Sequence, residues 1–402
     1  MSSSILLARQ AIFDRNLKTV AYELLYRSPD GQGPILPFNG SIATAKVLQH
    51  AYSCIFDQGK VKTLPAFINF NAEWLYNGDL PSLKPEALVL EILEDIPMTP
   101  ELVDRLQFLS DAGYRLALDD FLYDQSWDKA LKIVQFVKID IQQLSPAQLV
   151  RHVSELKKHN VTLLAEKVET YQQYNYCRSL GFKLFQGYFF CRPEPVRGVD
   201  HAASSVTMLS LIAELEDPDV TPEALEAIIL REPQLVIRLL KIVNSARYAL
   251  SREVSNISEA IIAIGLNELK KWVMLLTVSD CNVKTTELIR EILARAKMCE
   301  LMAEKYSLPP NTAFMIGLLS GMDALLNISM SEITTQLALA HDVKAALNTQ
   351  EGELGKLLHD VKYFMCGSWD DLYHKHDSGG IALAYSQSLQ WVMDTMQELE
   401  SI

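Results

Sequence analysis

The chain of 402 residues lacks the features that would set it apart from ordinary globular proteins. It has only 17 glycines and 16 prolines, and 49% of its residues are hydrophobic, which excludes collagen-like repeats and disorder as its main content. No run approaches the ~18 apolar residues that a membrane-spanning helix requires, and the N-terminus lacks the pattern of a signal peptide. We therefore expect a cytoplasmic globular protein without a membrane partner.

Cysteine and positive charge are also scarce. The six cysteines are scattered without a CxxC pair, which favours buried free thiols in a reducing compartment over disulfides. The 37 basic residues are outnumbered by 50 acidic ones, which gives a formal net charge of -13. Such a chain repels anionic surfaces, so we expect no nucleic-acid partner. A phosphate ligand would need local cations or bound metal ions.

Short apolar runs alternate with helical patterns in the first half of the chain. The runs span residues 19–25, 67–70, 88–93, 114–118, 136–139, 161–165 and 182–185. The segment 99–112 between two of them carries Leu102, Leu106 and Leu109 at helical spacing. The alternation predicts an α/β fold, either a (β/α) barrel or a doubly wound sheet. The chain has neither GxGxxG nor GxxxxGK[ST], so nothing recommends the dinucleotide-binding or P-loop versions.

The pattern changes to helix alone after about residue 205. Apolar residues then recur at spacings of three and four, as in Leu225, Ile228 and Ile229. Thr221 and Pro222 are typical of a helix start, and Pro233 of a break before the next helix. We therefore predict an α/β domain over residues 1–205 and an all-α domain over residues 206–402.

Polar side chains stand at or near the ends of the predicted strands. In order they are Glu23, Asn69, Glu91, Asp119, Asp120, Lys138, Asp140, Glu166 and Gln186. In a (β/α) barrel this edge carries the catalytic groups. Glu91 lies within an apolar run, where a lone ionised carboxylate would cost about several kcal/mol. Carboxylates that converge on one site favour binding of Mg²⁺ or Mn²⁺, which indicates metal-assisted hydrolysis of a phosphate ester. The alternative is that these polar residues are ordinary solvated strand ends without a shared site.

These residues stand in motifs that resemble those of the EAL-domain cyclic-di-GMP phosphodiesterases. The motifs are Glu23-Leu24-Leu25, Leu90-Glu91-Ile92-Leu93-Glu94, Asp119-Asp120-Phe121, Val137-Lys138-Ile139-Asp140, Ala165-Glu166-Lys167-Val168-Glu169 and Gln186-Gly187-Tyr188. The resemblance spans about residues 5–200. It implies a TIM-like (β/α) barrel that binds cyclic-di-GMP and, when active, hydrolyses one phosphodiester to linear pGpG with two Mg²⁺ or Mn²⁺ ions.

The resemblance also implies roles for individual residues. The implied metal ligands are Glu23, Asn69, Glu91, Asp119 and Asp120. The implied catalytic residues around the attacking water are Lys138, Glu166 and Gln186. The implied ligand contacts are Gln10 and Arg27, and the residues implied to support the site's loops are Glu94, Asp140 and Glu169.

Several residues depart from the family's pattern. Leu24 replaces an alanine, and the loop after Asp120 lacks both family glycines, whose conformations Leu122 and Asp124 adopt only at a cost. Lys167 replaces a glycine, and strand alternation predicts that its side chain points away from Glu166. These departures leave two hypotheses open: a weak or conditional phosphodiesterase, and a catalytically silent cyclic-di-GMP sensor or adaptor.

The second half resembles the HDOD domain, a helical relative of the HD phosphohydrolases. The resemblance rests on residues 235–246, 257–262 and 264–266. It implies a regulatory or interaction module for an unidentified signalling protein, and a homodimer is also open. The chain has Ser320-Gly321-Met322-Asp323 where a metal-binding relative would carry His-Asp, so no second catalytic site is implied.

Several histidines could be mistaken for metal ligands. His-Asp pairs occur at 341–342, 359–360 and 376–377, and we interpret them as surface or capping residues rather than metal ligands. His152 and His159 lie in helix-like segments and are predicted to be solvated.

Overall fold

The chain forms two compact units in a computed structural model. The structure describes residues 6–27, 64–70, 72–77, 84–187, 214, 220–279, 286–326, 328–337, 339–369, 372 and 378–400. One unit comprises Met1–Arg192 with Tyr363–Ser386, and the other Pro193–Lys362 with Gln387–Ile402. The predicted boundary at residue 205 lies outside the described residues.

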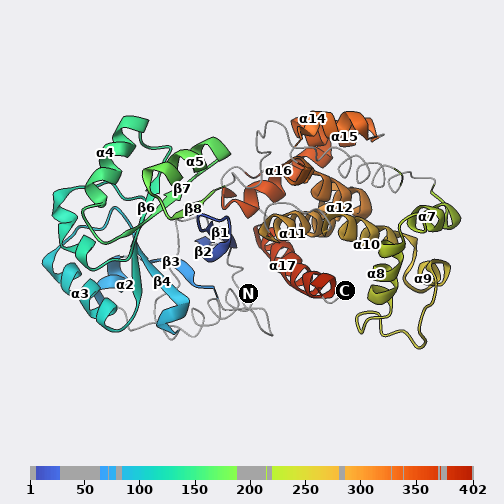
Figure 1. The fold of residues 1–402 in the computed structure, drawn as a ribbon, viewed down its shortest axis with the longest axis horizontal. Coiled ribbons are helices and arrows are strands. Elements are labelled where there is room, and N and C mark those ends of the chain that lie inside the picture. The colour runs from blue at the N-terminus through green and yellow to red at the C-terminus, as the bar shows by residue number, and fades with distance from the viewer. Residues whose placement is uncertain are drawn as a thin grey trace. The chain divides into compact units, whose positions relative to one another are not determined.

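Eight strands close into a barrel in the first unit (Figure 1). They are β1 (Leu6–Phe13), β2 (Thr19–Arg27), β3 (Ala66–Phe70), β4 (Leu88–Ile92), β5 (Arg115–Leu118), β6 (Phe136–Asp140), β7 (Thr162–Glu166) and β8 (Leu184–Gln186). Neighbours from β2 to β8 are parallel, whereas β1 runs antiparallel to both β2 and β8. The predicted TIM-like barrel is confirmed, with one reversed strand that the apolar runs did not reveal.

Helices follow several of these strands and lie outside the barrel (Figure 1). They are α2 (Ala72–Asn77), α3 (Pro100–Asp111), α4 (Pro146–Leu156) and α5 (Tyr171–Leu180). The predicted apolar face of α3 is confirmed, because Leu102, Leu106 and Leu109 are all buried. Side-chain caps fix where the helices begin: Ser145 forms a capping box at the start of α4 and Thr170 another at α5. The caps set the chain's direction as it leaves each strand.

The barrel interior consists of two layers of side chains. The apolar layer contains Ile12, Ala21, Phe67, Val89, Ala117, Phe136, Leu164 and Leu184. Moving two residues along each strand reaches the polar layer, which contains Gln10, Glu23, Asn69, Glu91, Asp119, Lys138, Glu166 and Gln186. Residues two apart in a strand point to the same side, so all eight strands direct one apolar and one polar residue inward. The apolar layer thus closes the barrel beneath the polar one.

Every regular element described from residue 220 onward is a helix. The α-helices are α7 (Pro222–Ile229), α8 (Pro233–Val243), α9 (Ile257–Ile264), α10 (Leu266–Ser279), α11 (Thr286–Met302), α12 (Pro310–Leu319), α13 (Met322–Leu326), α14 (Met330–Gln336), α15 (His341–Thr349), α16 (Gly352–Met365) and α17 (Ser378–Glu400), and a 3-10 helix (Ala303–Tyr306) follows α11. Thr221 caps α7 and Pro233 begins α8, as the sequence predicts. In the described part of the chain, no helix has both the length and the apolar character needed to cross a membrane.

Candidate active site

Lys138 stands at the centre of the polar layer. Its side chain is fully buried, and its Nζ lies 2.7 Å from carboxylate oxygens of both Glu91 and Asp119. Nζ also lies 3.0 Å from an oxygen of Glu23 and 3.0 Å from one of Glu166. Four acids that lie far apart in the sequence thus converge on a single ammonium group. Parallel strands bring them together because each strand presents its polar residue at the same level of the barrel.

Burial and mutual repulsion determine the protonation of these groups. Burial alone lowers the pKa of Lys138, but the four carboxylates together raise that pKa well above its usual value. Burial raises the pKa of Glu91 and of Glu166 well above their usual range, and Lys138 only partly opposes the effect. One ammonium group would not balance all four carboxyl groups in their ionised forms, so a bound divalent cation would favour ionisation of Glu91 and Glu166.

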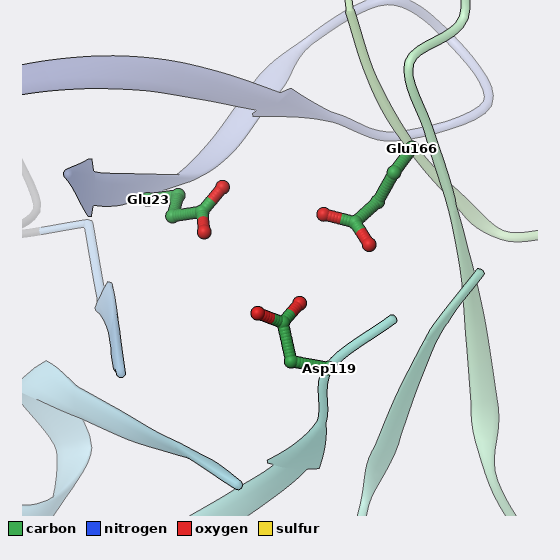
Figure 2. A group of neighbouring side chains, drawn as sticks. All are labelled: Glu23, Asp119 and Glu166. Carbon is green, nitrogen blue, oxygen red and sulfur yellow. The ribbon is translucent and has the colours of Figure 1, made fainter. Parts of the chain in front are cut away.

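Three of the acids are arranged to share an ion. Glu23, Asp119 and Glu166 each offer a carboxylate oxygen, and these oxygens lie within 4.8 Å of one another (Figure 2). Within the described part of the chain, Asn69 Oδ1, Glu91 Oε2 and Glu166 Oε2 are buried without a hydrogen-bond partner. Buried polar atoms normally have partners. Carboxylate and amide oxygens are the ligands that Mg²⁺ and Mn²⁺ prefer, so this donor set fits a hard divalent cation.

Gln186 links two sides of the polar layer. Its Nε2 donates to Glu23 Oε2 at 2.5 Å and to Gln10 Oε1 at 2.7 Å. The next residue, Gly187, has a φ of +141°, and a Cβ there would lie 2.1 Å from the carbonyl oxygen of Val168. A glycine is therefore required where β8 ends, because the backbone after β7 passes directly against it. This close approach fixes Gln186 beside Glu23.

A second acidic group lies beside the first. Burial and the neighbouring Asp119 raise the pKa of Asp120, whose backbone has a φ of +43°. Asp140 ends β6; its Oδ1 accepts from the backbone N–H of Gln142 at 2.8 Å, and its Oδ2 accepts from Lys167 Nζ at 2.5 Å. The expected direction of Lys167 is wrong, since this residue follows the last residue of β7 with a φ of +53° and leaves the strand alternation.

His152 on α4 holds the loop that lacks the family's glycines. In the neutral imidazole of His152, Nδ1 accepts from the backbone N–H of Tyr123 at 3.3 Å, and Nε2–H donates to the carbonyl oxygen of Phe121 at 3.0 Å. Burial lowers the pKa of His152. The prediction that His152 is solvated is therefore wrong. Helical periodicity alone gave no signal for its role, because its partners are backbone atoms of a loop about 30 residues earlier.

The remaining predicted site residues are placed as follows. Arg27 is the last residue of β2, and its side chain lies outside the described part of the structure. Glu94 is exposed in the turn after β4. Glu169 Oε1 accepts from Gln142 Nε2 at 2.9 Å, next to the loop that carries Lys167.

The His-Asp pairs divide into three cases. His341 is exposed at the start of α15, as expected. Asp360 is only 1% exposed and its Oδ2 accepts from the hydroxyl of Tyr306 at 2.7 Å, so the expectation of a surface or capping role is wrong for it. The pair at 376–377 lies outside the described residues.

Comparisons with known proteins agree on two domains. A family model described as EAL domain matches residues 65–193, and one described as HDOD domain matches residues 203–370. "Uncharacterized protein YuxH" of Bacillus subtilis is 32% identical over 98% of this chain and 99% of its own length. "Cyclic di-GMP phosphodiesterase CdgJ" of Vibrio cholerae is 34% identical over 90% of this chain and 85% of its own.

Solved structures match the chain over a smaller part. The calcium/cyclic-di-GMP complex of BlrP1 from Klebsiella pneumoniae is 26% identical, with a TM-score of 0.38. The match covers 47% of this chain and 56% of that one, so the chain spans less than two thirds of its length.

Proposed function

This chain belongs to the family of proteins that join an EAL domain to an HDOD domain, and we propose that its barrel hydrolyses cyclic-di-GMP to linear pGpG with Mg²⁺ or Mn²⁺. The convergence of Glu23, Glu91, Asp119 and Glu166 on the buried Lys138 carries this proposal. A relative of 34% identity that matches along most of both chains carries the name of a cyclic di-GMP phosphodiesterase, which supports the substrate.

Five residues of the polar layer have oxygen atoms that would hold a metal ion. Glu23, Asn69, Glu91, Asp119 and Glu166 would bind it through their oxygens, three of which have no hydrogen-bond partner among the described residues. When bound there, a divalent cation would polarise a phosphoryl oxygen and lower the pKa of a water molecule. The resemblance implies a second ion, for which Asp120 would be a ligand.

The protein's own residues then carry the proton transfer. Glu166, whose pKa is raised by burial, accepts a proton from the attacking water as the water oxygen bonds to phosphorus. The bond between phosphorus and the 3′-oxygen breaks, and the proton passes to that oxygen. The products are a 5′-phosphate and a 3′-hydroxyl. Lys138 is held cationic by the four acids and opposes the negative charge that develops on the phosphoryl group.

Product formation by the full chain tests this function. We expect the purified protein with Mn²⁺ to convert cyclic-di-GMP to pGpG, resolved by chromatography, and Glu23→Gln to lower the rate by roughly 10² or more. Glu86→Gln is the matched control, because the Glu86 side chain is exposed before β4, and it should leave the rate unchanged. Absence of pGpG with the unmodified protein would overturn the enzymatic proposal.

A catalytically silent sensor or adaptor is the second candidate. The observation that favours it is the loop after Asp120, where Leu122 and Asp124 replace glycines and where His152 holds the backbone in one arrangement. Isothermal titration calorimetry distinguishes the two functions. Binding of cyclic-di-GMP without product indicates a sensor, and the absence of any binding leaves an adaptor.

The helical unit is proposed as a regulatory or interaction module. Leu230, Ile237 and Ile262 are large apolar side chains that are more than half exposed, and they belong to α7, α8 and α9 or their ends. Only a contiguous apolar patch that includes such side chains would mark a protein-binding surface. An unidentified signalling protein and a homodimer both stay predictions, as do the domain limits 1–205 and 206–402.

A further inference from the structure

The turn that ends α16, at residues 366–367, contacts the first strand of the barrel. The segment Tyr363–Ser386 belongs to the same compact unit as the barrel. Within that unit, Gln10 Nε2 donates to the backbone carbonyl oxygen of Cys366 at 2.9 Å. The backbone N–H of Arg9 also donates to the hydroxyl oxygen of Tyr385 on α17, at 3.4 Å. Strand β1 is thus held by a part of the chain that lies far away in the sequence.

Gly367 lets the 366–367 turn lie directly against β2. Its φ is +76°, and a Cβ there would lie 2.5 Å from Cδ1 of Leu25. Leu25 stands two residues beyond Glu23 on β2. The backbone N–H of Gly367 donates to the carbonyl oxygen of Phe364 at 3.0 Å, which closes the turn. Any other residue at 367 would be strained by the positive φ and would press on Leu25.

Two glutamine amides connect the 366–367 turn with Glu23. Because Gln10 donates to Cys366 through Nε2, its Oε1 faces the barrel and accepts from Gln186 Nε2 at 2.7 Å. The second proton of Gln186 Nε2 is donated to Glu23 Oε2. A backbone carbonyl at one end of this chain and a carboxylate at the other can only accept. These two ends therefore determine which way both amides between them are turned.

This orientation leaves the oxygen of Gln186 available inside the barrel. Gln186 Oε1 is buried and has no hydrogen-bond partner among the described residues. Buried polar atoms normally have a partner, so this oxygen is placed to accept a hydrogen bond from a bound water or ligand. If the amide were turned over, Oε1 would face the acceptor oxygens of Gln10 and Glu23. The contact at Cys366 thus favours the orientation that keeps Oε1 available.

We infer that Gln10 is a positioning residue, through which the 366–367 turn sets the orientation of Gln186 and so of an acceptor for the attacking water. The inference rests on the proposed function, because it presupposes that this water reacts. It also assigns a means of regulation. Helices α16 and α17 each have one end in the barrel unit and the other in the helical unit. A change in the helical unit that moves the 366–367 turn would release Gln10 and lower the rate.

Steady-state kinetics of the full chain with Mn²⁺ test the inference. We expect Gln10→Met, which removes both amide contacts, and Gly367→Ala, which displaces the turn, each to lower kcat roughly tenfold and to leave KM unchanged. The double variant should lose no more than either single variant, because both changes break the same chain of hydrogen bonds.

Two matched controls should keep the kcat of the unmodified protein. Gln172→Met changes a glutamine that is exposed on α5. Gly352→Ala imposes the same backbone strain as Gly367→Ala, since Gly352 has a φ of +74°, but a Cβ there would meet nothing within 4 Å.

Hydrogen exchange of the metal-free protein gives a measurement that does not depend on turnover. We expect the backbone amides of Gly367 and Ser368 to exchange faster in Gln10→Met than in the unmodified protein or Gln172→Met, because the turn loses its attachment to β1. Unchanged exchange would overturn the inference. So would a rise in KM alone in Gln10→Met, full activity in Gly367→Ala, or additive losses in the double variant, and each of these leaves the proposed function intact. Absence of pGpG with the unmodified protein would overturn the proposed function and the inference with it.

Discussion

Lys138 is the residue on which the polar layer depends. Its ammonium contacts four carboxylates and is completely buried, so it is the counter-ion of these acids inside the barrel. The pKa values of Glu91 and Glu166 are raised even with this lysine present. Without Lys138, the same acids would face one another across a water-poor interior. The lysine therefore stabilises the metal-free barrel as well as serving the proposed chemistry.

Replacement of this lysine should be costly to the fold. We expect Lys138→Met to lower the metal-free free energy of unfolding by about 3–5 kcal/mol, because it leaves buried carboxylates without a counter-charge. Urea denaturation of the full chain measures the change. Lys132→Met is the control, since Lys132 is exposed, and it should change stability by less than about 0.5 kcal/mol. Equal stability of the two variants would contradict the assigned role of Lys138.

Individual residues also show what the sequence can and cannot predict. The acids that converge were predicted because each stands at or near the end of an apolar run and within a motif of the resemblance, as Glu91 and Glu166 do. Lys167 was not, since alternation applies only within a strand and this residue has a positive φ just beyond β7. His152 was not predictable either, because its backbone partners carry no side-chain signature.

Among the elements, the loop after β5 is held chiefly from outside itself. The backbone N–H of Phe121 donates to the carbonyl oxygen of Lys138 at 3.0 Å, and His152 of α4 contacts the backbone on both sides of Leu122. Tyr123 donates its hydroxyl proton to Asp128 at 3.0 Å. The position of Asp120 thus depends on the packing of α4. Neither Leu122 nor Asp124 has a positive φ, and Asp124 is extended with a φ of −135°, so the expectation that these two residues adopt glycine conformations at a cost is wrong.

Protonation of His152 should therefore weaken this loop. Burial lowers the pKa of His152 below its usual 6.5, so the unfolded chain takes up the proton first as the pH falls. The stability that the neutral imidazole contributes is present above pH 6.5 and is lost as the pH falls through the folded-state pKa. We expect the melting temperature to fall less steeply below pH 6.5 in His152→Gln than in the unmodified protein.

A matched histidine provides the control for that measurement. His341 is exposed at the start of α15, and His341→Gln should leave the pH dependence of the melting temperature unchanged. An identical slope in His152→Gln and the unmodified protein would refute the coupling between this histidine and the loop.

Strand β1 shows where prediction of elements from the sequence ends. The runs that became β2 to β8 were recognisable because they are largely apolar and are followed by helical patterns or turns. In β1, Arg9 and Gln10 interrupt the apolar residues, and the strand is antiparallel to both of its neighbours. Its place becomes clear only when the barrel closes, since Ile12 completes the apolar layer and Gln10 receives a hydrogen bond from Gln186. Closure is a property of all eight strands together.

For the molecule as a whole, the acidic composition and an anionic ligand are compatible. The net charge of -13 argues against binding a phosphodiester without cations. Four of the acidic residues lie in the polar layer, where they are paired with Lys138, and three of them are arranged to bind an ion. Bound cations reverse the local electrostatic effect of such a cluster. The net charge of the whole chain therefore does not predict the sign of the electrostatic potential at the metal-loaded site.

Metal binding should stabilise only one of the two units. Among the described residues, the sole group of three or more acids, histidines or cysteines placed to hold an ion is Glu23, Asp119 and Glu166, within the barrel. A ligand that binds only the folded state at 100 times its Kd adds about 2.7 kcal/mol to the stability of the unit that binds it. We therefore expect Mn²⁺ to raise the barrel's unfolding transition in calorimetry of the full chain and to leave the helical unit's transition in place. Glu23→Gln should reduce the shift, and an equal shift of both transitions would show that the ion acts beyond the barrel.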